Sequence, residues 1–254
     1  MMGLVVAEVR KLTSVVTTWV LTGLGMLLVV LGSALFLFLT EFGVGEFLGT
    51  DPQVAFVADQ VGGANIIVVI VALLSMTTEF RHGTIGRTLQ ITPGRTRLLV
   101  AKLVGGTIYA LGFLVLGLAV GAILLAIAAA VNAVGLEIGG QTLTSIWQGA
   151  VGLTLTAWFG VALGALLRSQ VVAITLTLVW SFVVEPAFGG LLPAVGKWLP
   201  FNALNAVFVG DEAVAAMGEM GPQMLDPLVG LSVFIGYGVV AAVAAVWLLR
   251  TRDV

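Results

Sequence analysis

The sequence has little charge for its length. Charged residues make up 9% of its 254 residues, while 59% are hydrophobic and the mean hydropathy is +1.15. A soluble domain of this size carries roughly 25% charged residues, because its core has to be covered by a wetted surface. This chain cannot form such a surface. The composition therefore excludes a soluble globular domain and predicts that much of the surface faces lipid.

Cysteine is absent, and His82 is the only histidine. Disulfides and thiolate metal sites are therefore excluded, and no histidine cluster is available for a metal ion. A Gly-x-x-x-x-Gly-Lys-Ser/Thr phosphate loop is also missing, because Gly196-Lys197 is followed by Trp198 and has Leu191 at the first glycine position. We expect no catalytic residue, metal or cofactor in this chain and no nucleic-acid partner. A membrane enzyme is the least expected class.

Long windows without charge predict the membrane spans. A charge at mid-bilayer costs about 2.5–3.5 kcal/mol, and a span has to be helical because lipid offers no partner for unpaired backbone groups. The first window is too long for the apolar part of a cleaved signal peptide, so we expect it to be retained. The chain is thus predicted to be a single all-α polytopic domain over 1–254, with about six spans near 15–39, 61–76, 103–134, 147–167, 171–184 and 228–249.

The basic residues predict the orientation. With the N-terminus in the cytoplasm, only Lys197 lies outside, and acidic residues such as Asp51 and Asp59 fall in external loops. Both termini are then cytoplasmic. A composition rich in Ala, Val, Gly and Leu indicates the inner (plasma) membrane of a bacterium. The ten basic residues on the cytoplasmic side are Arg10, Lys11, Arg81, Arg87, Arg95, Arg97, Lys102, Arg168, Arg250 and Arg252.

Two segments differ from simple spans. Residues 1–14 are predicted to form an amphipathic interfacial helix, with Glu8, Arg10 and Lys11 largely off its apolar stripe. Residues 185–200 are apolar but interrupted by proline and glycine, which predicts short re-entrant helices on the outer side. The stripe of the first segment consists of Val5, Val9, Leu12, Val16 and Trp19.

Segment 79–102 carries five basic residues and one acid between the second and third spans. We expect a short helix at 85–91 that ends before Pro93, because proline disfavours helix at the preceding residue. Such a segment can dock into an acidic groove, or it can be an ordinary basic loop that touches anionic lipid.

In this segment the sequence resembles the membrane subunit of type-2 ATP-binding-cassette exporters. That family typically has a glutamate after the second span, then Gly-Thr, a leucine, a proline followed by arginine, and a lysine at the third span. The N-terminal Glu8 to Leu12 and the broken segment through Trp198 to Leu204 are also similar to this family. Here basic residues follow Pro93 at two and four positions, where the family more often has one at three. The matching residues are Glu79, Gly83, Thr84, Leu89, Pro93 and Lys102.

The resemblance implies a permease subunit that expels an amphipathic drug, peptide, lipid or glycoconjugate. It would work as a homodimer or close heterodimer with separate ATPase subunits, which would hold ATP and Mg²⁺. The N-terminal helix with Glu8, Arg10 and Lys11 would transmit movement together with the coupling segment. The residues implied in ATPase coupling are Glu79, Gly83, Thr84, Ile85, Arg87, Leu89, Pro93, Arg95, Arg97 and Lys102.

Glu185 and two glycine pairs have alternative interpretations. An intramembrane acid is a candidate for a transport pathway, but Pro186 favours a helix end with a solvated Glu185. The pairs Gly117/Gly121 and Gly160/Gly164 allow close helix approach, more plausibly within the chain than at a dimer seam.

Two other classes stay open. An ion-coupled secondary transporter usually shows an internal repeat and mid-membrane acids, whereas the first four predicted spans here contain no charge. A non-transporting scaffold would need no ATPase and would tolerate changes at Gly83-Thr84.

Overall fold

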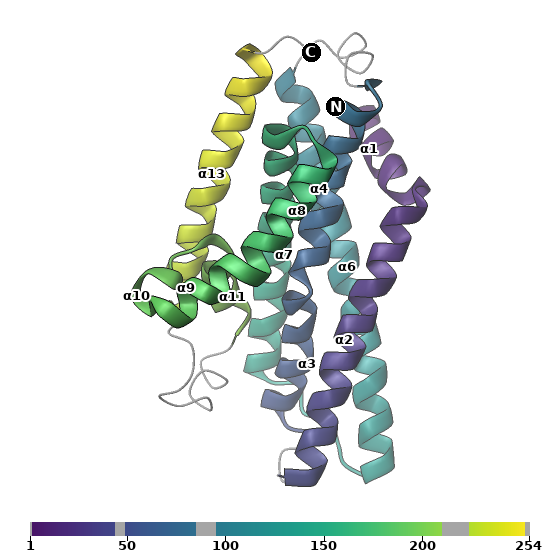
Figure 1. Cartoon of the computed structure of the whole chain (residues 1–254). Helices are drawn as coiled ribbons and strands as arrows, with labels where there is room; N and C mark the ends of the chain where they lie inside the picture. Colours follow the sequence, from purple (N-terminus) through teal and green to yellow (C-terminus); the bar gives the residue numbers. More distant parts are fainter. Residues whose placement is uncertain (1, 44–48, 85–94, 210–223, 252–254) are drawn as a thin grey trace.

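The computed structural model describes residues 2–43, 49–84, 95–209 and 224–251, and no strand occurs among them. Helices account for nearly all of this part of the chain, which confirms the all-α class (Figure 1). The elements are α1 (Met2–Ser14), α2 (Val16–Gly43), α3 (Asp51–Gly63), α4 (Asn65–Arg81), α6 (Arg95–Asn132), α7 (Gly140–Leu167), α8 (Gln170–Val179), the π-helical turn η1 (Trp180–Val184), α9 (Glu185–Leu191), α10 (Pro193–Gly196), α11 (Pro200–Phe208) and α13 (Pro227–Thr251).

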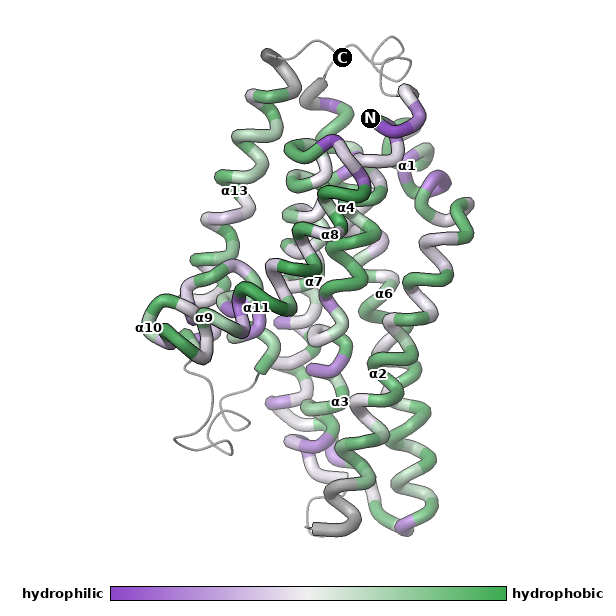
Figure 2. The backbone as a smooth tube through the Cα atoms, in the orientation of Figure 1, coloured by the Kyte–Doolittle hydropathy of each residue, from purple (hydrophilic) through white to green (hydrophobic). Residues whose placement is uncertain are grey.

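Among the described residues, six helical segments are long and apolar enough to cross a membrane, so the protein is a polytopic membrane protein. Hydrophobic residues dominate the lengths of α2, α6 and α13, whereas hydrophilic residues are found at the end with the two termini and along the far halves of α3 and α7 (Figure 2). The six segments are Val16–Phe38, Asp51–Arg81, Arg97–Asn132, Gly140–Leu167, Gln170–Leu191 and Pro227–Leu248.

The second span lies at the centre of the bundle, where α4 packs along α7. In its most apolar window 78% of the residues are buried, against 22% for the first span. Gly160 and Gly164 of α7 lie against the α4 backbone, since a Cβ at Gly160 would be 2.6 Å from the Val69 carbonyl oxygen. On α6, Gly117 and Gly121 lie in the same way against valines of α3. All four glycines therefore serve close packing within this chain.

The second span is longer than the sequence predicts, because α3 and α4 follow each other with a break only at Ala64. Asp59, expected in an external loop, therefore lies inside this span, where it hydrogen-bonds Ser145 of α7. The helical segment of the second span therefore includes an acidic residue that the expected window 61–76 does not. An ionisable side chain within a membrane-spanning helix is tolerated where it faces protein and has a polar partner, and the composition of a sequence window does not reveal such a partner.

The fifth span also continues further than predicted. Pro186 was expected to end it, yet Gln170–Leu191 is one helical segment that includes a π-helical turn at Trp180–Val184. Proline lacks an N–H and its ring clashes with a carbonyl one turn earlier, and the wider π turn directly before α9 accommodates this defect. Of the expected re-entrant segment 185–200, the part up to Leu191 therefore continues the helix of the fifth span, and α10 and the first residue of α11 make up most of the rest.

Helix α11 turns back against α13 and α7 (Figure 1). Its apolar face is buried, and Phe208 lies against Gly62 of α3 and Gly152 of α7, where any side chain would collide with its ring. Gly230 of α13 lies equally close to the Ala203 carbonyl of α11. Glycines on three helices, which have no side chain, thus leave the space that α11 occupies.

Candidate functional site

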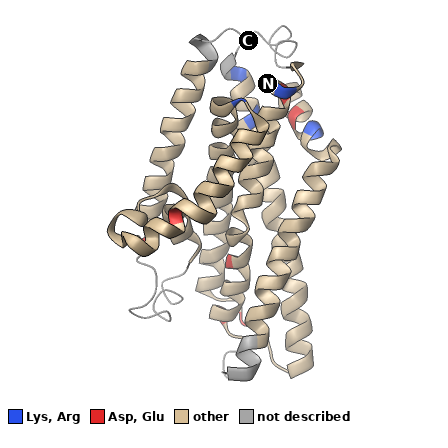
Figure 3. Ribbon diagram, viewed as in Figure 1, with Lys and Arg blue, Asp and Glu red and all other residues tan. Residues whose placement is uncertain are grey.

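Lysine and arginine residues gather at the end of the bundle where both termini lie, which we call the basic end (Figure 3). Four charged residues of this end are joined by ion pairs, each lysine to both glutamates, and form what we call the charge cluster. Glu8 and Lys11 come from α1, Glu79 from the last turn of α4, and Lys102 from the beginning of α6. All four are among the residues that the family resemblance singles out.

Lys102 is the centre of the charge cluster. Its Nζ donates to Glu8 Oε2, to Glu79 Oε1 and to the Ser75 carbonyl, each at 2.8 Å. These three bonds use all the donors of an ammonium group. The side chain is completely buried, so the cation depends on these partners.

Lys11 completes the cluster from its rim, with a half-exposed side chain. Its Nζ donates to Glu8 Oε1 at 2.7 Å and to Glu79 Oε1 at 2.8 Å. Partial burial lowers the pKa of Lys11, but the hydrogen bonds and charges of Glu79 and Glu8 outweigh it and raise the pKa above 10.5. The ion pairs of Lys11 therefore persist throughout the physiological pH range and are lost only as the pH rises through that raised value.

The burial of Glu8 differs from the predicted amphipathic pattern. Glu8 is 3% exposed and the only buried residue of α1, whereas Val6 is 56% exposed. The reason is its partner Lys102, which lies 94 residues further along the chain and so cannot influence a local periodicity. Gly105 of α6 lets α1 approach, because a Cβ there would lie 3.3 Å from that of Glu8.

The remaining residues of the predicted coupling segment lie around the cluster or outside the described part. Gly83 has φ +62°, a left-handed conformation that suits glycine, directly after α4. Thr84 Oγ1 donates to the Glu79 carbonyl at 3.5 Å, and Arg97 is exposed near the start of α6. Ile85, Arg87, Leu89 and Pro93 lie outside the described residues, as do the expected helix at 85–91 and the side chain of Arg95.

Arg168 is a residue of the basic end that the sequence analysis did not single out. It ends α7 with φ 54°, its Nη2 donates to the Leu248 carbonyl of α13 at 3.2 Å, and its guanidinium lies 5.2 Å from the ring centroid of Phe80. It thereby joins α4, α7 and α13. Its position as the only basic residue between the fourth and fifth spans was the available signal.

Glu185 is not solvated, so that expectation is wrong. It is 1% exposed, and its carboxylate accepts from Trp180 Nε1 at 2.7 Å, from Phe201 N at 2.9 Å and from Asn202 N at 2.6 Å. The last two are free N–H groups of the first turn of α11, which favour an anion. Glu185 thus caps α11 from another helix and fixes the re-entrant turn.

Glu185→Ala is expected to destabilise the fold by about 3 kcal/mol or more, because several buried N–H donors would lose their acceptor at about 1–3 kcal/mol each. Thermal unfolding in detergent measures this. Asp226→Ala is the matched control, since Asp226 Oδ1 also accepts an N-terminal helix N–H, that of Leu228 in α13, but at an exposed position. Its loss should stay near the 0.5–2 kcal/mol of an ordinary cap. Equal losses for both variants would contradict the buried cap.

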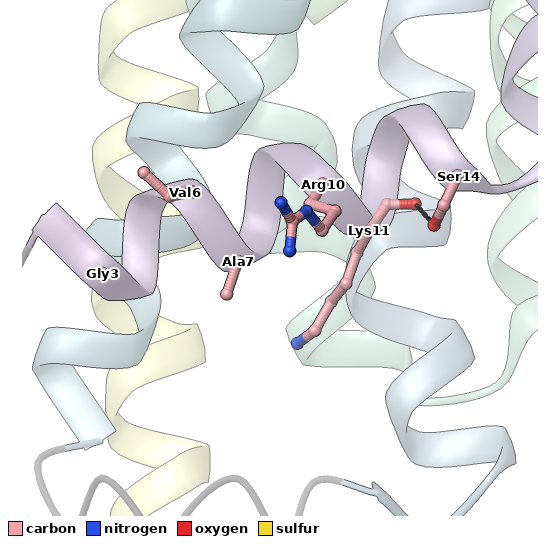
Figure 4. A pocket seen from close by; sticks show the side chains of 6 residues that line it. All are labelled: Gly3, Val6, Ala7, Arg10, Lys11 and Ser14. Atoms are coloured by element: carbon pink, nitrogen blue, oxygen red, sulfur yellow. Dashed lines mark hydrogen bonds between the residues drawn. The ribbon is translucent and has the colours of Figure 1, made fainter.

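Two hollows lie beside α1. One is a shallow groove along its outer side, formed by Gly3, Val6, Ala7, Arg10, Lys11 and Ser14 (Figure 4). The other is a cavity of about 110 Å³ between the bend at Val15 that joins α1 to α2 and the facing helix α4. The charge cluster forms one wall of this cavity through Glu8, Lys11 and Glu79.

Within the described residues, no group of three or more His, Asp or Glu side chains could hold a metal ion. The charge cluster consists of four ion pairs that join α1, α4 and α6. Neither protein-family models nor curated protein sequences give a match to this chain.

Proposed function

We propose that this protein is the membrane-spanning permease subunit of an ATP-binding-cassette exporter, driven by separate ATPase subunits that bind at the basic end. The observation that carries the proposal is the charge cluster. Glu79 and Lys102 border the segment that resembles a coupling helix, and both pair with the N-terminal helix, Glu79 with Lys11 and Lys102 with Glu8. A force applied to either element therefore reaches α1, α4 and α6 together.

The charge of the surface supports an acidic partner. Arg10, Arg81 and Arg97 are exposed at the basic end, whereas the carboxylates of Glu8 and Glu79 are buried in ion pairs. The described surface there is consequently of one sign, which favours docking of an acidic groove. The groove along α1 adds exposed Val6 beside Arg10 and provides an apolar contact next to the charges (Figure 4).

The wider assignment follows from this proposal and from the basic residues. Both termini would be cytoplasmic in a bacterial plasma membrane, two permease copies would form the pathway, and an amphipathic substrate would move outward. ATP and Mg²⁺ would be bound by the partner subunits. One observation favours the second candidate, an ion-coupled transporter, because Asp59 lies within a span and hydrogen-bonds Ser145.

The test is affinity purification from native membranes in mild detergent, with detection of a co-purifying ATPase and of vanadate-sensitive ATP hydrolysis. We expect both for the wild type and neither after scrambling of 83–93. The matched control scrambles 133–138, the connection between α6 and α7, and should retain the partner. Absence of an ATPase, under conditions that preserve a known complex of this class, would contradict the proposal and leave the ion-coupled transporter or the scaffold.

A further inference from the structure

We propose that the cavity between the α1–α2 bend and α4 binds the headgroup of a zwitterionic aminophospholipid, of the phosphatidylethanolamine class. This inference goes beyond the proposed function and requires no ATPase partner. It rests on the position of the cavity, on an unsatisfied carboxylate oxygen, on the net charge of the wall and on apolar residues that continue from it.

The cavity lies at the depth of lipid headgroups. Val15 separates α1 from the first span, and Trp19, one turn further, is 59% exposed and donates from Nε1 to the Thr13 carbonyl at 2.7 Å. Exposed tryptophans that reach a polar partner are typical of the membrane–water interface. A volume of about 110 Å³ is several times the roughly 10–15 Å³ that one water requires.

One carboxylate oxygen of Glu79 has no hydrogen-bond donor within the described part of the chain. It is 6% exposed, and its Oε1 accepts from both lysines, but Oε2 is buried and has no hydrogen-bond partner among the described residues. An unsatisfied buried carboxylate oxygen is costly, because it has left water without a replacement donor. Glu79 lines the cavity, so a rotation of its carboxylate toward the cavity would let a ligand with N–H groups supply that donor.

The charge of the wall selects a zwitterion. The wall residues Glu8 and Glu79 are balanced by Lys11, which also lines the cavity, and by Lys102, which pairs with both but does not line it. A ligand with net charge would therefore add an uncompensated charge at low dielectric. A primary ammonium can donate to Glu79 Oε2, while the phosphate two carbons away can reach Lys11. Two of the three Lys11 donors are used within the cluster, and its side chain is 49% exposed.

The rest of the lining fits the beginning of an acyl chain. Besides the charged residues, the cavity is lined by the apolar residues Leu12, Val15, Val71 and Leu74 and by Thr17 and Thr18. Val15 is 47% exposed, so the cavity is open toward the surrounding lipid. A polar headgroup with attached chains therefore matches the site better than a soluble metabolite does.

The proposal can be tested with lipids that differ in the number of N–H donors on the headgroup nitrogen. Purified, delipidated protein is titrated by native mass spectrometry with phosphatidylethanolamine, its mono- and dimethylated forms, and phosphatidylcholine, all with identical chains. Because phosphatidylcholine has no N–H to donate to Glu79, we expect it to bind roughly tenfold more weakly, with the methylated lipids between. Equal binding of phosphatidylethanolamine and phosphatidylcholine would overturn the proposal. Displacement by glycerophosphoethanolamine alone would contradict a lipid as the ligand.

Neighbouring residues of the bend give a matched pair of variants. Val15 lines the cavity, whereas Val16 does not and is 74% exposed. Val15→Trp is expected to remove the preference for phosphatidylethanolamine, and Val16→Trp to retain it. Glu79→Gln should lower the ratio of phosphatidylethanolamine to phosphatidylcholine binding toward one. If this variant does not fold, the two tryptophan variants still test the proposal. Equal preference in both tryptophan variants would place the lipid elsewhere.

Discussion

Lys102→Met is expected to destabilise the fold by roughly 3–5 kcal/mol, which is the usual cost of removing one partner of a buried ion pair. Methionine retains the length and packing of the side chain but removes all three hydrogen bonds of Nζ. Glu8 and Glu79 would then share only Lys11, which lies at the rim. Thermal unfolding in detergent, followed by the loss of the monodisperse peak in size-exclusion chromatography, measures the effect.

Arg97→Met provides the matched control, because Arg97 is also a basic residue of α6 but is exposed. Its expected change lies within about 0.5 kcal/mol. Adding Glu8→Gln to Lys102→Met restores the charge balance of the cluster and should recover part of the lost stability. If the two methionine variants unfold at the same temperature, the charge cluster is not the buried network described here.

The general architecture could be predicted from composition, because the cost of placing a residue in lipid depends on the type of that residue. Lipid penalises charge and unpaired backbone groups wherever they occur, so charge-free windows indicate six helices without knowledge of their partners. The prediction failed where a partner cancels the penalty. Asp59 has Ser145 on a neighbouring helix, and Pro186 follows a π turn, so both spans continue past the residue that should have ended them.

The residues of the candidate site could be predicted from the sequence, but their contacts with one another could not. The resemblance selected Glu79 and Lys102 by their order in a motif, and Glu8 and Lys11 by a second motif. Nothing in the sequence indicated that Glu8 and Lys11 meet Glu79 and Lys102, because contacts across 68 to 94 residues leave no local pattern. Periodicity even placed Glu8 on the outer side of α1. Glu185 and Arg168 were misjudged or missed for the same reason, since their partners belong to other helices.

The small residues of α7 could serve packing within the chain or contact with a second copy, and the sequence alone does not distinguish the two. A Gly-x-x-x-Gly spacing indicates only that another helix can approach closely. That helix can belong to the same chain or to a second copy of the chain. In the structure Gly160 and Gly164 face the most buried span of the protein. Substitution there consequently tests the core itself rather than assembly.

Gly160→Ala combined with Gly164→Ala is expected to abolish folding, or to reduce stability by well over the 1–3 kcal/mol typical of an overpacked core. The two methyl groups would lie 2.6 Å from the Val69 carbonyl oxygen and 2.7 Å from that of Leu73. Both are backbone atoms of α4, so no side chain can rotate away, and the two central helices would have to separate. Yield of monodisperse protein and its unfolding temperature measure the loss.

Gly112→Ala on α6 is the control, because, apart from the adjacent residues and backbone of its own helix, no atom of the described residues lies within 4 Å of the added methyl group. Alanine is the better helix former by up to about 1 kcal/mol, so this variant should be as stable as the wild type or slightly more stable. A double α7 variant that folds normally and loses only its association with a second copy would assign the glycine pair to a dimer seam. Since both carbonyls belong to the same chain, we expect the folded monomer itself to be lost.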